Sequence, residues 1–93
     1  MNRGSEGPTG VSVIIPCHDE GATIAEVVAG CHRALAGHRH EVLVVDDGSG
    51  DDTAARAEGA GARVLRLSPN RGKGRALAAG VEAARHAVVA FLD

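Results

Sequence analysis

Two adjacent acids, Asp46 and Asp47, follow the apolar run VLVV in the stretch EVLVVDDGSGDDTAA, residues 41–55. Their like charges repel, so a simple turn does not explain the pair. Carboxylates accept hydrogen bonds from a nucleotide base or ribose, and they bind Mg²⁺ or Mn²⁺. In extended backbone the two side chains point to opposite sides, so one can face a ligand while the other caps the following turn. The structural alternative is that both acids only cap the turn and helix.

Other polar clusters also follow apolar segments. They are PCHDE at 16–20, SPNRGKG at 68–74 and the last residue, Asp93. The second cluster contains Arg71 and Lys73, so bases are available beside the acids. This mixture suits a ligand with N–H and hydroxyl groups at one end and phosphates at the other, because basic groups and glycine N–H groups hold a diphosphate. The alternatives are a solvated loop around Lys73, a plain strand-to-helix connection at 16–20, and a frayed terminus at Asp93.

The segments between these clusters predict the elements that position them. Short runs rich in Val, Leu, Ile and Ala predict four strands, at 11–15, 41–45, 62–67 and 87–92. Helices are expected over 23–36, 51–59 and about 75–86. One helix face is expected to comprise Ile24, Val27, Val28, Cys31 and Leu35, and another Leu77, Val81 and Ala84. Thr23 and Glu26 have the spacing of a capping box.

The order β-α-β-α-β-α-β predicts an α/β fold, Rossmann-like, with a parallel sheet and right-handed crossovers. Nearly continuous apolar strands indicate a sheet that is covered on both faces. In such a sheet ligands bind outside the carboxyl ends of the strands, and every unusual polar cluster of this sequence follows a strand. The clustering is stronger evidence for a binding site than any single motif.

The amino-acid composition argues against several classes of function. The net charge is −2 and aromatic residues make up 1% of the chain, which argues against a nucleic-acid partner. Cys17 and Cys31 have no metal-site spacing and are expected to be free thiols in a reducing compartment. No apolar run approaches the length of a membrane span, so a cytoplasmic location is expected. Residues 1–10 lack an apolar signal region and are expected to form a flexible leader.

Four blocks, VSVIIPCHDEGATIAEVV, EVLVVDDGSGDDTA, NRGKGRALAAGVEAA and VVAFLD, resemble the N-terminal half of glycosyltransferase family 2. Within the family the sequence is most similar to the dolichyl- or polyprenyl-phosphate sugar transferases. The resemblance covers residues 11–93 and implies the nucleotide-sugar-binding half of a GT-A fold, incomplete after the fourth strand.

The resemblance also implies roles for individual residues. Pro16, His18 and Glu20 would line the nucleotide pocket, although His18 stands where the family usually has Tyr or Phe. Asp19 likewise replaces the usual Asn. Asp47 would contact the base, and Asp46 would support the loop or the ribose.

The basic residues and the last acid complete the implied site. Lys73, with Arg71 nearby, would lie close to the base or the diphosphate. Asp93 matches the first acid of the family's D-x-D motif, which serves the ribose and a divalent metal, Mg²⁺ or Mn²⁺.

The implied activity is transfer of a sugar from a UDP- or GDP-linked donor to an acceptor such as a polyprenyl phosphate or a glycan, including at the cytoplasmic face of a membrane. The chain stops at Asp93, before the second D-x-D acid and the acceptor half that carries the family's general base. We therefore expect a donor-binding part with no catalytic residue, inactive by itself.

Two alternatives to a sugar transferase are considered. A non-catalytic nucleotide-binding or interaction module stays open. A nucleotidyltransferase would have a Gly- and Arg-rich loop after the first strand, and PCHDEGA is not such a loop. The apolar segment 87–92 is expected at the sheet edge, where it invites self-association.

Overall fold

The computed structural model describes residues 10–92. Its elements are β1 (Val11–Cys17), α1 (Ile24–Ala34), β2 (His40–Asp47), α2 (Thr53–Gly59), β3 (Arg63–Leu67), α3 (Lys73–Ala83) and β4 (Val88–Phe91). The predicted alternation of strands and helices is confirmed. β1 and β2 run two residues further than expected, so that Pro16, Asp46 and Asp47 belong to strands. Of the expected leader only Gly10 is described, and it is buried.

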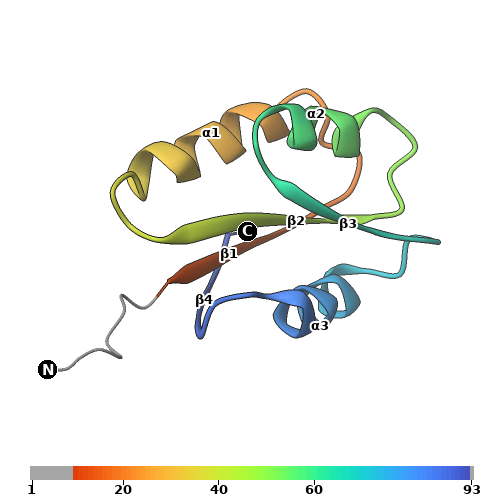
Figure 1. Cartoon of the computed structure of the whole chain (residues 1–93). Helices are drawn as coiled ribbons and strands as arrows, with labels where there is room; N and C mark the ends of the chain where they lie inside the picture. Colours follow the sequence, from red (N-terminus) through yellow and green to blue (C-terminus); the bar gives the residue numbers. More distant parts are fainter. Residues whose placement is uncertain (1–9, 93) are drawn as a thin grey trace, which may run out of the picture.

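The four strands form one parallel sheet in the order β3-β2-β1-β4 (Figure 1). Pro16 of β1 is paired with Val45 of β2, and Cys17 with Asp46. This register brings the polar ends of the two central strands to the same edge of the sheet.

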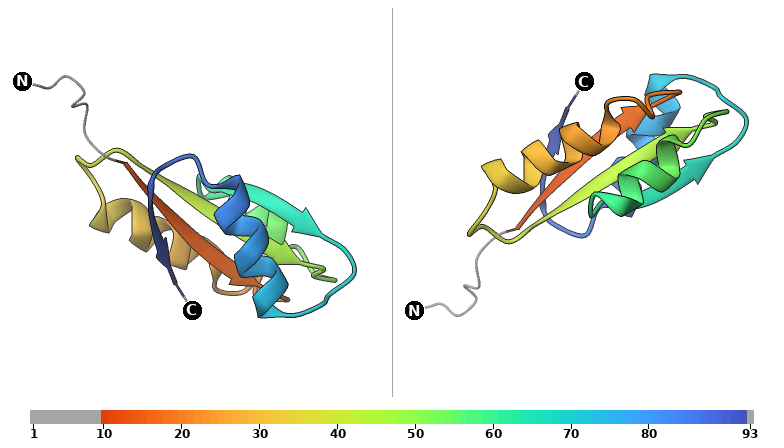
Figure 2. Two further views of the ribbon diagram at one scale, coloured as in Figure 1. Left: turned by 90° about the horizontal axis from the view of Figure 1, so that it is seen from below. Right: turned by 90° about the horizontal axis from the view of Figure 1, so that it is seen from above.

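Helices cover both faces of the sheet, as predicted. α1 and α2 lie on one face and α3 lies on the other (Figures 1 and 2). Along β2 the side chains alternate between two cores: Val42 and Val44 pack with α1, whereas Leu43 and Val45 pack with α3. The same alternation sends Asp46 and Asp47 to opposite sides, because successive strand residues face opposite ways.

The start of α1 differs from the expected capping box. Thr23 occupies the N-cap position, but its side chain makes no capping hydrogen bond. The backbone already forms a turn before the helix, in which the N–H groups of Thr23 and Ile24 donate to the carbonyl oxygen of Glu20 at 3.1 and 2.9 Å. The expected apolar face of α1 is confirmed, with Ile24 and Val28 buried.

Of the three residues expected on the buried face of α3, Leu77 and Ala84 pack against the core but Val81 does not. Val81 is 48% exposed, and Ala76 and Gly80 face the sheet instead. Small residues allow a close approach: a Cβ on Gly80 would lie 2.5 Å from Cγ2 of Ile14 and 3.2 Å from Cγ2 of Val45. The apolar period alone could not reveal this, because a buried glycine adds nothing to it.

Gly80→Ala is therefore expected to lower the free energy of unfolding by about 1–3 kcal/mol, because the added methyl overpacks the contact with β1. Gly74→Ala is the matched control in the same helix, since a Cβ there meets nothing within 4 Å. That variant should be neutral or more stable by up to about 1 kcal/mol. Urea unfolding measures both, and equal effects would contradict the packing argument.

At the amino end of the sheet, the strands are connected by Glu41, whose side chain is 12% exposed. Its carboxylate accepts from Ser12 Oγ at 2.7 Å, Arg63 Nε at 3.0 Å and the Arg85 N–H at 2.8 Å. Ser12 Oγ in turn accepts from the N–H of His86 at 3.1 Å. Glu41 thus connects β1, β2, β3 and the segment that enters β4.

Across residues 10–92, no helix combines the length and the apolar character needed to cross a membrane.

Candidate functional site

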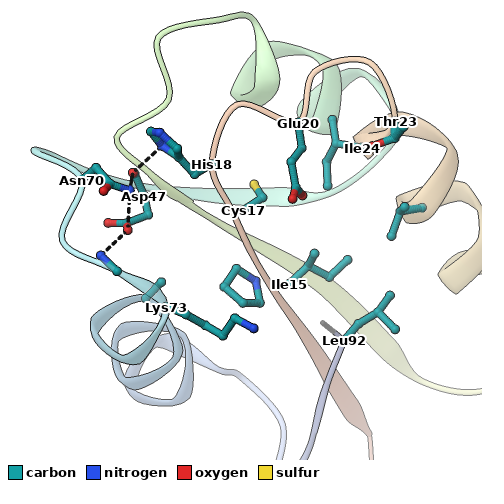
Figure 3. Close-up of a pocket in the computed structure, with 14 residues that line it drawn as sticks. Ile15, Cys17, His18, Glu20, Thr23, Ile24, Asp47, Asn70, Lys73 and Leu92 are labelled. Atoms are coloured by element: carbon teal, nitrogen blue, oxygen red, sulfur yellow. Dashed lines mark hydrogen bonds between the residues drawn. The ribbon is translucent and has the colours of Figure 1, made fainter.

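A cavity of about 400 Å³ opens at the carboxyl edge of the sheet, between the ends of β1 and β2 and the start of α3 (Figure 3). It is lined by Ile15, Pro16, Cys17, His18, Glu20, Thr23, Ile24, Val27, Asp47, Asn70, Gly72, Lys73, Ala76 and Leu92. The structure therefore brings together five of the residues singled out from the sequence, namely Pro16, His18, Glu20, Asp47 and Lys73. Their roles in binding stay predictions.

Asp47 is the most heavily bonded residue of the pocket. Its carboxylate, 5% exposed, accepts from Asn70 Nδ2 at 2.9 Å, from the Gly72 N–H at 2.7 Å and from Arg75 Nη2 at 3.1 Å. The Arg71 N–H lies 3.2 Å from both carboxylate oxygens. Asp47 therefore anchors the loop between β3 and α3 at the rim of the pocket.

These donors also decide the charge of Asp47. Burial alone would raise the pKa of the carboxyl group, but the N–H groups of Gly72 and Arg71 and the Arg75 guanidinium outweigh it and hold the pKa below its usual value. These donors keep the carboxylate ionised at neutral pH, although the side chain is only 5% exposed.

Asp46 and Arg71 do not line the cavity. Asp46 is buried on the opposite side of β2, where its Oδ1 accepts from the Ser49 N–H at 3.0 Å. It thus stabilises the turn after β2. Arg71 meets the site through its backbone N–H, and its residue is otherwise exposed. The predicted ribose and metal residue, Asp93, lies outside the described residues.

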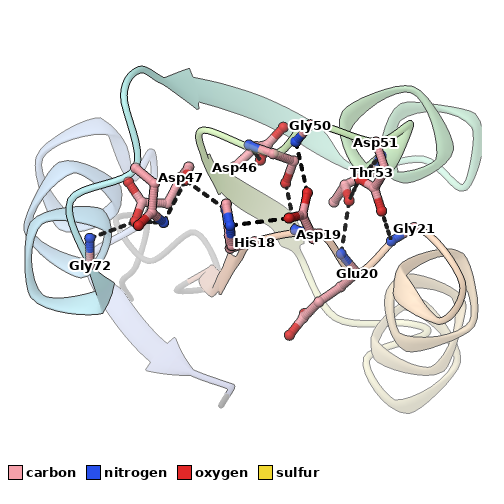
Figure 4. A network of polar contacts seen from close by, with 12 residues as sticks. His18, Asp19, Glu20, Gly21, Asp46, Asp47, Gly50, Asp51, Thr53 and Gly72 are labelled. Atoms are coloured by element: carbon pink, nitrogen blue, oxygen red, sulfur yellow. Dashed lines mark hydrogen bonds and ion pairs between the residues drawn. The ribbon is translucent and has the colours of Figure 1, made fainter.

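Hydrogen bonds also connect the loop after β1 to the loop after β2 (Figure 4). Asp19 donates its N–H to Ser49 Oγ at 2.8 Å and accepts the Gly50 N–H on Oδ1 at 2.7 Å. Asp19 has φ +52°, a left-handed conformation that Asp adopts more readily than most residues. His18 adds contacts to the Asp47 carbonyl oxygen at 3.1 Å and to the Asp19 carboxylate at 3.2 Å.

Glu20 and Lys73 reach into the pocket from different sides, from the loop after β1 and from the first residue of α3 (Figure 3). The Glu20 carboxylate makes no hydrogen bond or ion pair with another residue in the range 10–92. One accepting group and one cationic group therefore face the same space, which suits a ligand with both hydroxyl groups and phosphates.

The sequence did not reveal the floor of the pocket or Asn70. Apolar side chains such as Ile15, Ile24 and Leu92 form part of the floor, and in the sequence they resemble ordinary core residues. Asn70 lies in the 68–74 loop, which was singled out for its basic residues. The hydrogen-bonding amide of Asn70 is the feature by which the sequence could have identified it. Cys17 is 5% exposed, and burial, with Asp46, Glu20 and Asp51 nearby, raises the pKa of its thiol to about 12. It packs as a neutral thiol.

Among residues 10–92, no three His, Cys, Asp or Glu side chains are arranged to bind a metal ion. Asp46 and Asp47 already accept from backbone and side-chain donors, and Glu20 is the carboxylate that faces the pocket without such a donor among residues 10–92. The assignment of Asp93 as a metal ligand stays a prediction.

Comparison with known proteins gives close relatives that are much longer. Glucosyl-3-phosphoglycerate synthase of Mycolicibacterium paratuberculosis is 40% identical over 90 residues, which cover 89% of this chain and 27% of that protein. Dodecaprenyl-phosphate galacturonate synthase of Rhizobium johnstonii is 31% identical over 102 residues, covering 98% of this chain and 30% of that one. The chain thus spans about 30% of the length of these relatives.

Solved structures agree with these relatives. Glucosyl-3-phosphoglycerate synthase from Mycobacterium tuberculosis, in complex with Mn²⁺, uridine diphosphate and glucosyl-3-phosphoglycerate, superposes with a TM-score of 0.80 at 35% identity, over 91% of this chain and 33% of that one. The same synthase has been solved with Mg²⁺ and uridine diphosphate. The prediction of a Rossmann-like, GT-A-type α/β unit is confirmed. The model of the family described as glycosyl transferase family 2 matches residues 12–93, so the chain belongs to that family.

Proposed function

We propose that this chain binds the nucleotide-diphosphate part of a sugar donor, and that the protein to which it contributes transfers the sugar to a phosphate-bearing acceptor. The observation that carries the proposal is the pocket at the carboxyl edge of β1 and β2, where Glu20 and Lys73 face the same cavity. Uridine diphosphate is the preferred nucleotide, because similar proteins have been solved in complex with it.

The relatives support two classes of acceptor. One structure of the mycobacterial synthase contains Mn²⁺, UDP-glucose and phosphoglyceric acid, whereas the Rhizobium relative is named for dodecaprenyl phosphate. We place a small phosphorylated acid first, since the synthase is the more similar relative, and a polyprenyl phosphate second. The protein would work in the cytoplasm, or at the cytoplasmic face of a membrane if its acceptor is a lipid; detergent-free fractionation distinguishes the two.

Different pocket residues would contact different parts of the sugar donor. Glu20 would accept from hydroxyl or N–H groups of the nucleoside, and Lys73 would contact the base or the diphosphate. His18 would form a wall of the pocket. The main role proposed for Asp47 is to hold the 70–72 loop against β2. A direct contact with the base is its second proposed role.

For the metal ion, the proposal names one candidate protein ligand. Mn²⁺ or Mg²⁺ would neutralise the diphosphate when bound, with Asp93 as the protein ligand. The described residues add no further ligand set. None of them is assigned as the general base of the transfer.

Calorimetric titration tests the donor assignment. UDP with Mn²⁺ should bind saturably, GDP should bind at least about tenfold more weakly, and omission of Mn²⁺ should weaken UDP binding. A second experiment joins this chain to the downstream half of a full-length relative. UDP binding without any sugar transfer by that fusion would favour a non-catalytic module instead. Absence of binding by either nucleotide in a folded sample would overturn the proposal.

Self-association is proposed for the edge of the sheet. β4 is the last strand of the sheet order and is exposed at Phe91 (57%), with Leu92 (38%) beside it. An apolar, unpaired edge favours pairing with another chain. Sedimentation velocity over a hundredfold range of concentration should therefore show growing oligomers. Phe91→Lys should reduce them, and a monomer at every concentration would exclude the contact.

A further inference from the structure

The hydroxyl of Thr53 is a buried polar group that connects two loops beside the pocket. Thr53 is the first residue of α2 and is 0% exposed. Its Oγ1 accepts the N–H of Glu20 at 2.9 Å and donates to the carboxylate of Asp51 (Figure 4). The hydroxyl therefore acts as both acceptor and donor at a position closed to water.

Asp51 completes the connection. Its Oδ1 accepts from the Thr53 N–H at 3.0 Å, and its Oδ2 accepts from the Gly21 N–H at 3.1 Å. We call these two residues the Asp51–Thr53 bracket. The hydrogen bond from Thr53 holds the pKa of the Asp51 carboxyl below its usual value, so the bracket is charged at neutral pH.

The bracket fixes the backbone of Glu20 from one side, and α1 fixes it from the other. The Glu20 N–H is held by Thr53, while its carbonyl oxygen accepts the N–H groups of Thr23 and Ile24 at 3.1 and 2.9 Å. With both peptide groups held, the direction of the Cα–Cβ bond of Glu20 is fixed. The side chain points into the cavity, where its carboxylate has no partner among the described residues (Figure 3).

We propose that Asp51 and Thr53 are positioning residues for the nucleotide pocket, which hold the N–H groups of Gly21 and Glu20 and so aim the Glu20 carboxylate at hydroxyl or N–H donors of the bound nucleotide. The inference rests on the proposed function. It assigns a role to two residues that do not line the cavity, and it explains why a threonine hydroxyl is buried at the start of α2.

A double-mutant cycle tests the inference by calorimetry with UDP and Mn²⁺. Thr53→Val keeps the shape of the side chain but removes both hydrogen bonds of the hydroxyl, and it should weaken UDP binding about tenfold. In the Glu20→Gln background the same change should cost about twofold or less, because the group it positions has lost its charge. Thr53→Ser retains the hydroxyl and should bind within about twofold of the unmodified chain.

Asp52→Asn is the matched control. Asp52 is the neighbouring acid and the N-cap of α2, but its side chain is 56% exposed and pairs with Arg56 Nε at 2.7 Å rather than with Thr53. UDP affinity should change by about twofold or less. Asp51→Asn gives a second view of the bracket if Thr53→Val does not fold, and faster exchange of the Glu20 and Gly21 amide protons should accompany its weaker binding.

The outcomes separate the inference from the proposed function. If the unmodified chain binds neither UDP nor GDP, the proposed function fails and the inference with it. If UDP binds but Thr53→Val costs the same factor in the unmodified chain and in the Glu20→Gln background, Thr53 acts on the fold in general and the positioning role is overturned. A loss that needs the Glu20 carboxylate, with rescue by Thr53→Ser, supports the role.

Discussion

Glu41→Gln should lower the free energy of unfolding by about 3 kcal/mol at pH 7. The carboxylate is 12% exposed and bonds to β1, β3 and the segment before β4. Burial alone would raise the pKa of Glu41, but the hydrogen bonds from Arg63, the Arg85 N–H and Ser12 lower it from 4.5 to about 2.

The pH dependence follows from that lowered pKa. Because the folded state holds the carboxylate ionised, its contribution is fully present above pH 4.5 and is lost as the pH falls through about 2. The difference between the unmodified chain and Glu41→Gln should thus be about half as large at about pH 3 as at about pH 7. Urea unfolding at both values measures it.

Glu58→Gln is the control for this experiment. Glu58 pairs with Arg66 at 3.7 Å, and both side chains are more than half exposed. Its replacement should change the free energy of unfolding by less than about 1 kcal/mol at either pH. A loss at Glu41 that matched this control, or that did not shrink in acid, would show that the network at the amino edge does not stabilise the sheet.

Asp47→Ala should weaken UDP binding by about tenfold to a hundredfold, the range expected when charged hydrogen bonds are lost. The change leaves the Gly72 and Arg71 N–H groups and the Arg75 guanidinium without their acceptor. The 70–72 loop is then free to leave the pocket rim. Calorimetry gives the affinity, and amide exchange of Gly72 reports whether the loop has loosened.

Asp46→Asn is the informative comparison, because Asp46 and Asp47 are neighbours in sequence but their side chains lie on opposite sides of β2. Asp46 accepts one backbone N–H, from Ser49, and does not line the cavity. UDP affinity should fall by less than about threefold. Equal losses at the two positions would mean that the strand end as a whole matters, and that the loop anchored by Asp47 has no special part in binding.

The acid dependence of loop anchoring has the same sign as that of Glu41. The lowered pKa of Asp47 means that its contribution is present above the ordinary carboxyl range and is lost as the pH falls through the folded value. UDP binding by the unmodified chain should therefore weaken in acid.

The alternation of strands and helices, and the edge at which the polar residues gather, were both predictable from the amino-acid sequence alone. Apolar, β-branched runs such as residues 42–45 predict strands, and parallel strands must end on one edge, so Asp47, Glu20 and Lys73 were predictable as neighbours. The family followed from the same blocks, because short motifs keep their order along the chain.

What each polar group does depends on tertiary contacts that the sequence does not display. Asp46 and Asp47 look alike in sequence, but the alternation along β2 gives one to a turn and the other to a loop 23 to 28 residues away. The burial of Gly80 against β1 could not be predicted, because a glycine has no apolar side chain that would mark the buried face of α3. The partners of Thr53 and Glu41 were equally invisible, since hydrogen bonds across 29 to 44 residues leave no local pattern.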